Sequence, residues 1–113
     1  MPKITKETRI KQELIRLEEI YRGLPENKLA IVIPLLENAS FMKITLEDLQ
    51  ESINRNGCSE EYKNGENQYG KKAAADLQAY NSLIKNYNTI SDRLEKLLPP
   101  EQRESRLEAL RDE

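Results

Sequence analysis

The longest periodic pattern of apolar residues in the chain runs from Gly70 to Leu98. Its members fall on one face at helical spacing: Ala73, Leu77, Tyr80, Ile84, Tyr87, Leu94 and Leu98, widened by Leu83, Ile90 and Leu97. This period predicts one helix over 70–98 with a single buried side. The helix ends before Pro99 and Pro100, because proline cannot donate to the helical ladder. A helix of this length spans roughly 42 Å, which indicates an elongated hairpin or packing against another subunit.

A shorter pattern predicts a first helix over 5–23. Its apolar residues form a heptad-like seam: Ile10, Leu14, Leu17, Tyr21 and Leu24. Gly23 is a favourable helix stop and Pro25 a favourable first-turn residue for the next helix. The link between the two helices is therefore short, and we expect them to pack as neighbours.

The second helical region covers 26–55 and carries two signals of an interruption. Pro34 lies well past the first turn and should kink the helix. Thr45 followed by Asp48 matches a capping pattern, so a new helix could begin there. Because the apolar face continues through both points, we favour one kinked helix over two helices.

Residues 56–70 form the only long stretch without helical character, and they hold three of the four glycines. Asn64 and Gly65 predict a tight turn. A short hairpin and an irregular loop are both compatible with this stretch. Beyond the two prolines, residues 101–113 have the composition of a short, highly charged helix with a frayed end. The fold class is thus all-α, with three main helices in a single domain, 1–113.

Composition excludes several classes of function. Of the 113 residues, 37% are hydrophobic and 34% charged, and the formal net charge is -2. This charge gives no overall basic field for nucleic acid, although a local basic patch is compatible with it. The sequence has no histidine and one cysteine, Cys58. Disulfides within the chain, Cys/His zinc sites and Ser-His-Asp or Cys-His catalysis are therefore excluded.

The sequence carries no signal of an enzyme or of a membrane protein. Neighbouring carboxylates such as Glu18 with Glu19, or Glu60 with Glu61, are typical of a solvated helix face. No phosphate-binding, dinucleotide-binding or metalloprotease motif is present. We therefore expect no catalytic residue, no metal and no cofactor. The N-terminus lacks the apolar core of a signal peptide, and the run 29–36 is too short to cross a bilayer. A cytoplasmic protein without a membrane partner is expected.

Three sets of residues are candidates for binding. Basic side chains that could contact phosphates are Lys3, Lys6, Arg9 and Lys11, with Lys71 and Lys72 as a second cluster. Polar residues that could form a recognition loop are Asn64, Gly65, Asn67, Gln68 and Tyr69. Apolar residues that should build the bundle or a subunit interface are Ile10, Leu14, Leu17, Leu77, Tyr80, Ile84, Tyr87 and Leu94. The pattern does not separate core from interface within the last set.

Three stretches together resemble the small subunit of phage terminases, in particular the short prophage-encoded type from Gram-positive hosts. The first is ASFMKITLEDLQESINRNG at 39–57. The second is YKNGENQYGKK at 62–72, followed by AYNSLIKNY at 79–87. The third is LLPPEQR at 97–103, where Pro99 stands at a position that is usually Thr in the family.

This resemblance implies an all-helical protein that assembles into a homo-oligomeric ring, recognises viral double-stranded DNA and regulates the large ATPase-nuclease subunit during genome packaging. The helices and the long apolar stripe agree with it, whereas the residues alone do not demonstrate DNA binding. The alternative is a helical protein–protein interaction or scaffold module that has no DNA role.

Overall fold

Three long helices make up the part of the chain that the structure describes. The computed structural model describes residues 4–57 and 67–99, with the side chains of all of them except 57 and 67–71. The helices are α1 (Lys6–Tyr21), α2 (Glu26–Gly57) and α3 (Asn67–Leu97). The molecule is elongated, measuring 57 × 31 × 29 Å along its principal axes. The predicted all-α fold with three main helices is confirmed, while the predicted short helix over 101–113 lies outside the described residues.

α1 begins at a side-chain cap and ends at a tight connection. The Thr5 hydroxyl accepts a hydrogen bond from the Thr8 backbone N–H at 3.1 Å, which satisfies one of the unpaired donors of the first turn. After Tyr21 the chain turns, and the Leu24 N–H donates to the Tyr21 carbonyl at 3.2 Å. Pro25 stands immediately before α2, one residue short of the predicted first turn, and its carbonyl accepts a hydrogen bond from the Leu29 N–H at 2.9 Å.

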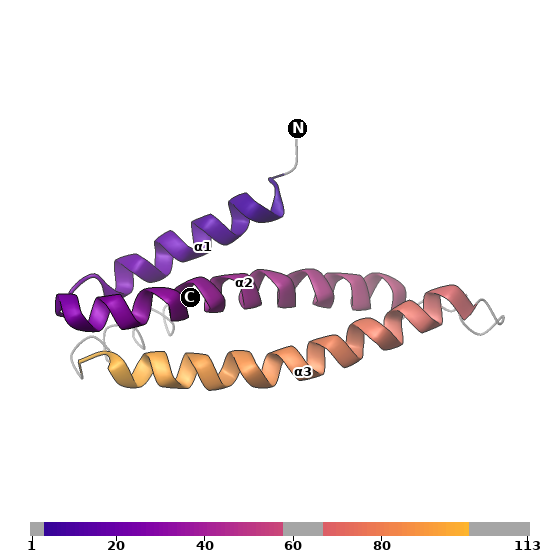
Figure 1. Cartoon of the computed structure of the whole chain (residues 1–113). Helices are drawn as coiled ribbons and strands as arrows, with labels where there is room; N and C mark the ends of the chain where they lie inside the picture. The colour runs from indigo at the N-terminus through magenta and orange to yellow at the C-terminus, as the bar shows by residue number, and fades with distance from the viewer. Residues whose placement is uncertain (1–3, 58–66, 100–113) are drawn as a thin grey trace, which may run out of the picture.

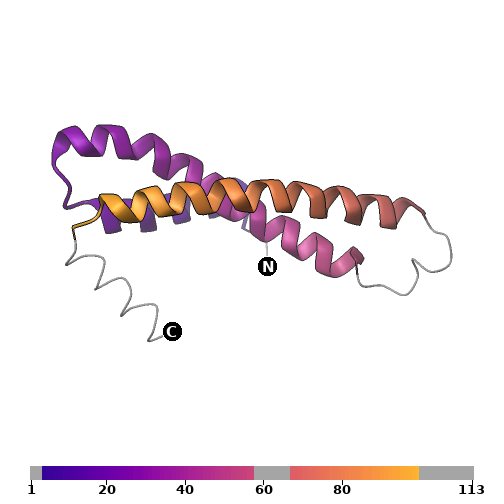
Figure 2. The ribbon, with the colours of Figure 1, turned by 90° about the horizontal axis from the view of Figure 1, so that it is seen from below.

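α2 is one continuous helix of 32 residues, so the prediction of a single helix is confirmed. Pro34 lies inside it, and Figure 2 shows that α2 bends within its first half. The capping pattern at Thr45 does not start a new helix, because Thr45 lies within α2 and Asp48 binds Arg9 of α1 instead. A tertiary contact thus replaces the local cap.

α3 begins three residues before the predicted start, which corrects the predicted loop over 56–70. Helix occupies residues 56–57 and 67–70, so Asn67, Gln68 and Tyr69 belong to the first turn of α3. Gly70 costs about 1 kcal/mol inside a helix, and the favourable residues Ala73 to Ala75 follow it. Whether 58–66 holds a hairpin or an irregular loop concerns residues outside the described part of the chain, Asn64 and Gly65 included.

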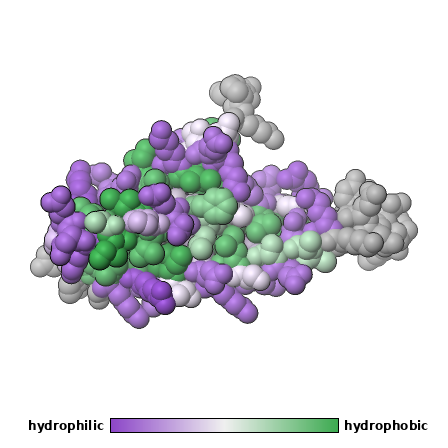
Figure 3. All heavy atoms as spheres, viewed as in Figure 1, coloured by the Kyte–Doolittle hydropathy of each residue, from purple (hydrophilic) through white to green (hydrophobic). Residues whose placement is uncertain are grey.

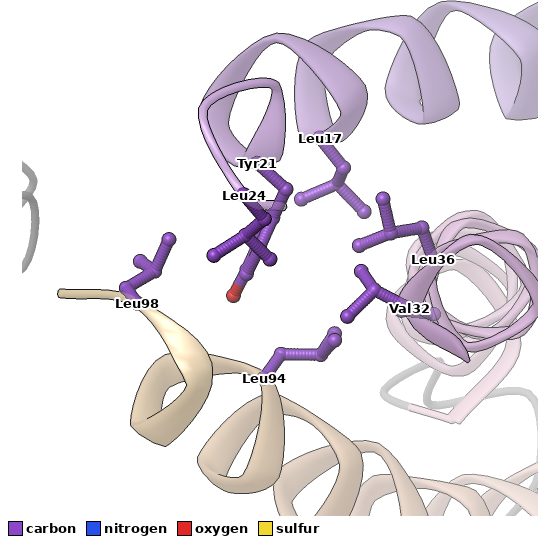
Figure 4. Packing of buried hydrophobic residues seen from close by; sticks show 8 residues of the cluster. Leu17, Tyr21, Leu24, Val32, Leu36, Leu94 and Leu98 are labelled. Atoms are coloured by element: carbon purple, nitrogen blue, oxygen red, sulfur yellow. The ribbon is translucent and has the colours of Figure 1, made fainter. Parts of the chain in front are cut away.

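The core lies at one end of the molecule, where all three helices meet. Figure 4 shows side chains from α1, α2 and α3 converging there. The buried members are Leu17, Tyr21, Leu24, Val32, Leu36, Ala39, Leu94 and Leu98. Towards the other end, α2 and α3 continue as a two-helix arm (Figure 1). There Ser52 of α2 donates a hydrogen bond to Asp76 of α3 at 2.5 Å.

α2 also has the length and composition of a membrane-spanning helix. Residues Glu26–Asn56 contain a window whose mean hydropathy is 1.5, and 33% of that window is buried inside the structure. Three of the buried residues of α2, Val32, Leu36 and Ala39, belong to the three-helix core. A core helix has the same apolar composition as a membrane span, so this property is weak evidence for a membrane.

Candidate interaction surfaces

An ionic cluster fixes α1 against the middle of α2. Arg9 of α1 donates to Asp48 at 2.6 Å and to Glu47 at 3.0 Å, both on α2. The pKa of the Arg9 guanidinium is raised, chiefly by its hydrogen bond to the Asp48 carboxylate. Glu13 lies one turn further along α1, and the Lys43 ammonium of α2 binds its carboxylate at 3.2 Å. These contacts hold the half of α1 that is farther from the three-helix core.

Glu13 is the buried centre of this cluster. Its side chain is only 6% exposed, and Arg16 donates to both of its carboxylate oxygens at 2.8 and 2.7 Å. Burial by itself would raise the pKa of Glu13, but the hydrogen bonds and charges of Arg16 and Lys43 outweigh burial and lower it. Glu13 is therefore ionised at neutral pH, and it neutralises cations from both helices.

The predicted phosphate-binding residues have different surroundings in the structure. Arg9 is committed to the two acidic residues of α2, and Lys72 lies 3.9 Å from Asp76. The Lys6 ammonium lies 5.0 Å from the centre of the Phe41 ring, a cation–π contact. Lys11 is exposed. Lys3 lies outside the described residues, and the side chain of Lys71 is not described.

The predicted core and interface residues divide according to their position along the hairpin. Leu17 and Leu94 are buried in the core, and Leu14 and Tyr87 pack against it. Ile10 is half-buried on α1. The remaining three lie between residues 77 and 84 of α3, where Leu77 is 47% exposed and Tyr80 and Ile84 are half-buried.

The exposure of this last group follows from the length of α1. With 16 residues, α1 spans roughly 24 Å, whereas the 31 residues of α3 span roughly 46 Å. α1 also diverges from α3 towards its N-terminus (Figure 1). The apolar face of α3 therefore continues beyond the core without a third helix over it. We call Leu77, Tyr80 and Ile84 the α3 stripe.

A second apolar surface lies between α1 and the first half of α2. It is a groove of about 330 Å³, here called the α1–α2 groove, and its lining residues are Ile15, Glu18, Glu19, Arg22, Leu29, Ile33 and Leu36. Leu36 is buried at its floor, while Ile15 is 57% and Ile33 39% exposed. Figure 3 shows hydrophobic surface gathered over this end of the molecule.

Sequence reasoning missed the α1–α2 groove. Ile15 lies one position outside the seam of α1, and Ile33 belongs to the apolar face of α2 as the sequence defines it. The only signal was an isoleucine next to the seam on a helix whose neighbouring positions are charged.

The recognition-loop residues do not form a described site. Asn64 and Gly65 lie outside the described residues, and Asn67, Gln68 and Tyr69 lie on the first turn of α3 with undescribed side chains. Within residues 4–57 and 67–99, no three acidic or cysteine side chains come together as a metal site.

Comparisons with known proteins do not identify a family for this chain. No protein-family model matches it, and neither curated proteins nor solved structures give a significant match.

Proposed function

We propose that this chain is a non-enzymatic small subunit of a phage DNA-packaging terminase, acting in the host cytoplasm. It would self-associate, contact viral double-stranded DNA and regulate the large ATPase-nuclease subunit. The observation that carries the proposal is the α3 stripe: an apolar helix face that the chain itself leaves half covered. An apolar helix face that one chain covers only in part supports the self-association in this proposal. The family named in this proposal rests on the resemblance of the three sequence stretches described above.

DNA contact, within this proposal, falls on fewer residues than the sequence indicates. Arg9 is held by Asp48 and Glu47, so a phosphate would have to compete with two carboxylates. Of the predicted phosphate-binding residues on α1, Lys6 and Lys11 are exposed, and Lys6 lies over the Phe41 ring. The commitment of Arg9 within the chain, together with the net charge of -2, favours the alternative of a helical interaction module without DNA binding.

Retention on double-stranded DNA separates the two functions. The variant Lys6→Gln with Lys11→Gln is preferable to charge reversal of Arg9, which would place a third carboxylate beside Asp48 and Glu47. If both lysines contact phosphates, the slope of log affinity against log salt falls by about 2, since each contact contributes about 0.9.

The matched control is Lys28→Gln with Lys96→Gln, which removes the same charge from α2 and α3. It should bind DNA as the parent does. Equal retention by the parent and the Lys6/Lys11 variant would refute the α1 assignment. A parent chain that fails to bind DNA at low salt would favour the interaction module.

A further inference from the structure

We infer that the α3 stripe of one copy docks into the α1–α2 groove of a second copy, in a head-to-tail contact. This inference rests on the proposed self-association and specifies the two surfaces that make it. Both are apolar helix surfaces that the described part of the chain covers only in part, with Leu77 exposed on the stripe and Ile15 and Ile33 exposed in the groove, and they lie on different helices. The occupant of the groove is thus a second copy of this chain.

The dimensions of the two surfaces agree. Leu77 and Ile84 are seven residues apart on one face of α3, a separation of about 10 Å along the helix axis. The α1 wall of the groove, from Ile15 to Arg22, covers the same number of residues and the same length. The α2 wall offers Ile33 and Leu29 one turn apart. Two aliphatic side chains of one helix can therefore lie along the groove between the helices of another.

The charges beside the two surfaces are complementary. Glu18 and Glu19 line the groove, and the one cation there, Arg22, already binds Glu19 at 3.0 Å. Between residues 72 and 91 of α3, the charged side chains that are exposed are those of Lys72 and Lys85. The acid of that segment, Asp76, is 18% exposed, accepts a hydrogen bond from Ser52 and lies 3.9 Å from Lys72, so the charge of Lys72 is partly offset and Lys85 is the main basic residue beside the stripe. An acidic rim thus meets a helix with exposed basic residues, which favours this pairing over stripe against stripe or groove against groove.

A single copy can use both surfaces at once. The groove lies between α1 and the first half of α2, and the stripe lies on residues 77–84 of α3. Such a contact is heterologous, so each copy can receive one neighbour and dock into another. Repetition closes into a ring when the rotation between copies permits closure, and otherwise gives an open filament.

Two substitutions and their mixture test the contact. Ile33→Asp places a carboxylate in the groove and leaves the stripe intact, whereas Leu77→Asp does the reverse. Each should weaken self-association by roughly a hundredfold or more, because an unpaired carboxylate would be buried in the contact. An equimolar mixture should form a dimer containing one of each variant and nothing larger, measured by light scattering behind a sizing column. Ile31→Asp, at an exposed isoleucine of α2 outside the groove, should associate as the parent does.

Mixing also guards against misfolding, because an unfolded variant would not form the mixed dimer. Association of Ile33→Asp alone, at the parent's strength, would overturn the inference in favour of stripe-to-stripe pairing or another occupant of the groove. Association of Leu77→Asp alone would overturn it in favour of groove-to-groove pairing. In either case self-association as a function survives. A monomeric parent chain would instead refute the proposed self-association itself.

A charge exchange provides an independent measurement. Glu18→Lys should weaken association by up to about fivefold, the effect of one exposed ion pair. Adding Lys85→Glu to the same chain should restore it. If the double variant is weaker than either single variant, these two residues do not face each other and the orientation is wrong.

Discussion

Replacing Leu36 with alanine is expected to lower the free energy of unfolding by about 2–5 kcal/mol. Leu36 lies on α2 with 1% of its surface exposed, at the point where α1 and α3 both approach (Figure 4). The substitution removes buried aliphatic carbons and leaves a cavity between three helices, which cannot all move inward together. The expected loss is a large part of the stability of a domain of this size.

The matched control for this prediction is Ile31→Ala, in the same first half of α2. Ile31 is 68% exposed, so its truncation should change the free energy of unfolding by no more than about 0.5 kcal/mol. Denaturant unfolding followed by circular dichroism, at one fixed chain concentration, measures both variants. Equal losses for the two variants would mean that α2 does not face the other helices as described.

Replacing Glu13 with alanine is expected to lower the free energy of unfolding by about 1–3 kcal/mol. The substitution leaves Arg16 and Lys43 close together without the carboxylate that separates their charges. The loss stays below that for a fully buried ion pair, because Arg16 and Lys43 are partly exposed and reach water. Glu37→Ala, at an exposed carboxylate of α2, should have little effect.

The contribution of Glu13 should also depend on pH in a definite direction. Its pKa is lower in the folded chain than the ordinary value of 4.5, so the unfolded chain binds the proton more readily. The stabilisation is therefore complete well above pH 4.5 and is lost as the pH falls through the folded pKa. The difference in unfolding free energy between the parent and Glu13→Gln should shrink as the solution is acidified from pH 7. A difference that grows on acidification would contradict the assignment.

The periodicity of apolar residues was sufficient to predict the three helices. The spacing from Leu77 to Leu94 identified α3, and the continuous apolar face through Thr45 correctly favoured one long α2. The apolar pattern predicts a start at Gly70, but the helix extends back to Asn67. Local propensity is a weak signal at a helix end, and packing decides the boundary.

The pattern could not divide the stripe of α3 into core and surface. Leu77 and Leu94 occupy the same face of one helix, and periodicity treats them alike. Only the length and direction of α1 leave Leu77 exposed while Leu94 is buried. The same limit applies to Arg9, because its partners Asp48 and Glu47 are about 40 residues away in sequence. Contacts between distant residues are not encoded in a local period.

The molar mass of the parent chain in solution tests the central claim of self-association most directly. Light scattering behind a sizing column, at low and moderate salt, gives the mass without reference to shape. We expect a single species of several times the 13.1 kDa chain mass, because the α3 stripe and the α1–α2 groove each receive a neighbour. A species of 13.1 kDa at every concentration and both salt levels would contradict the account.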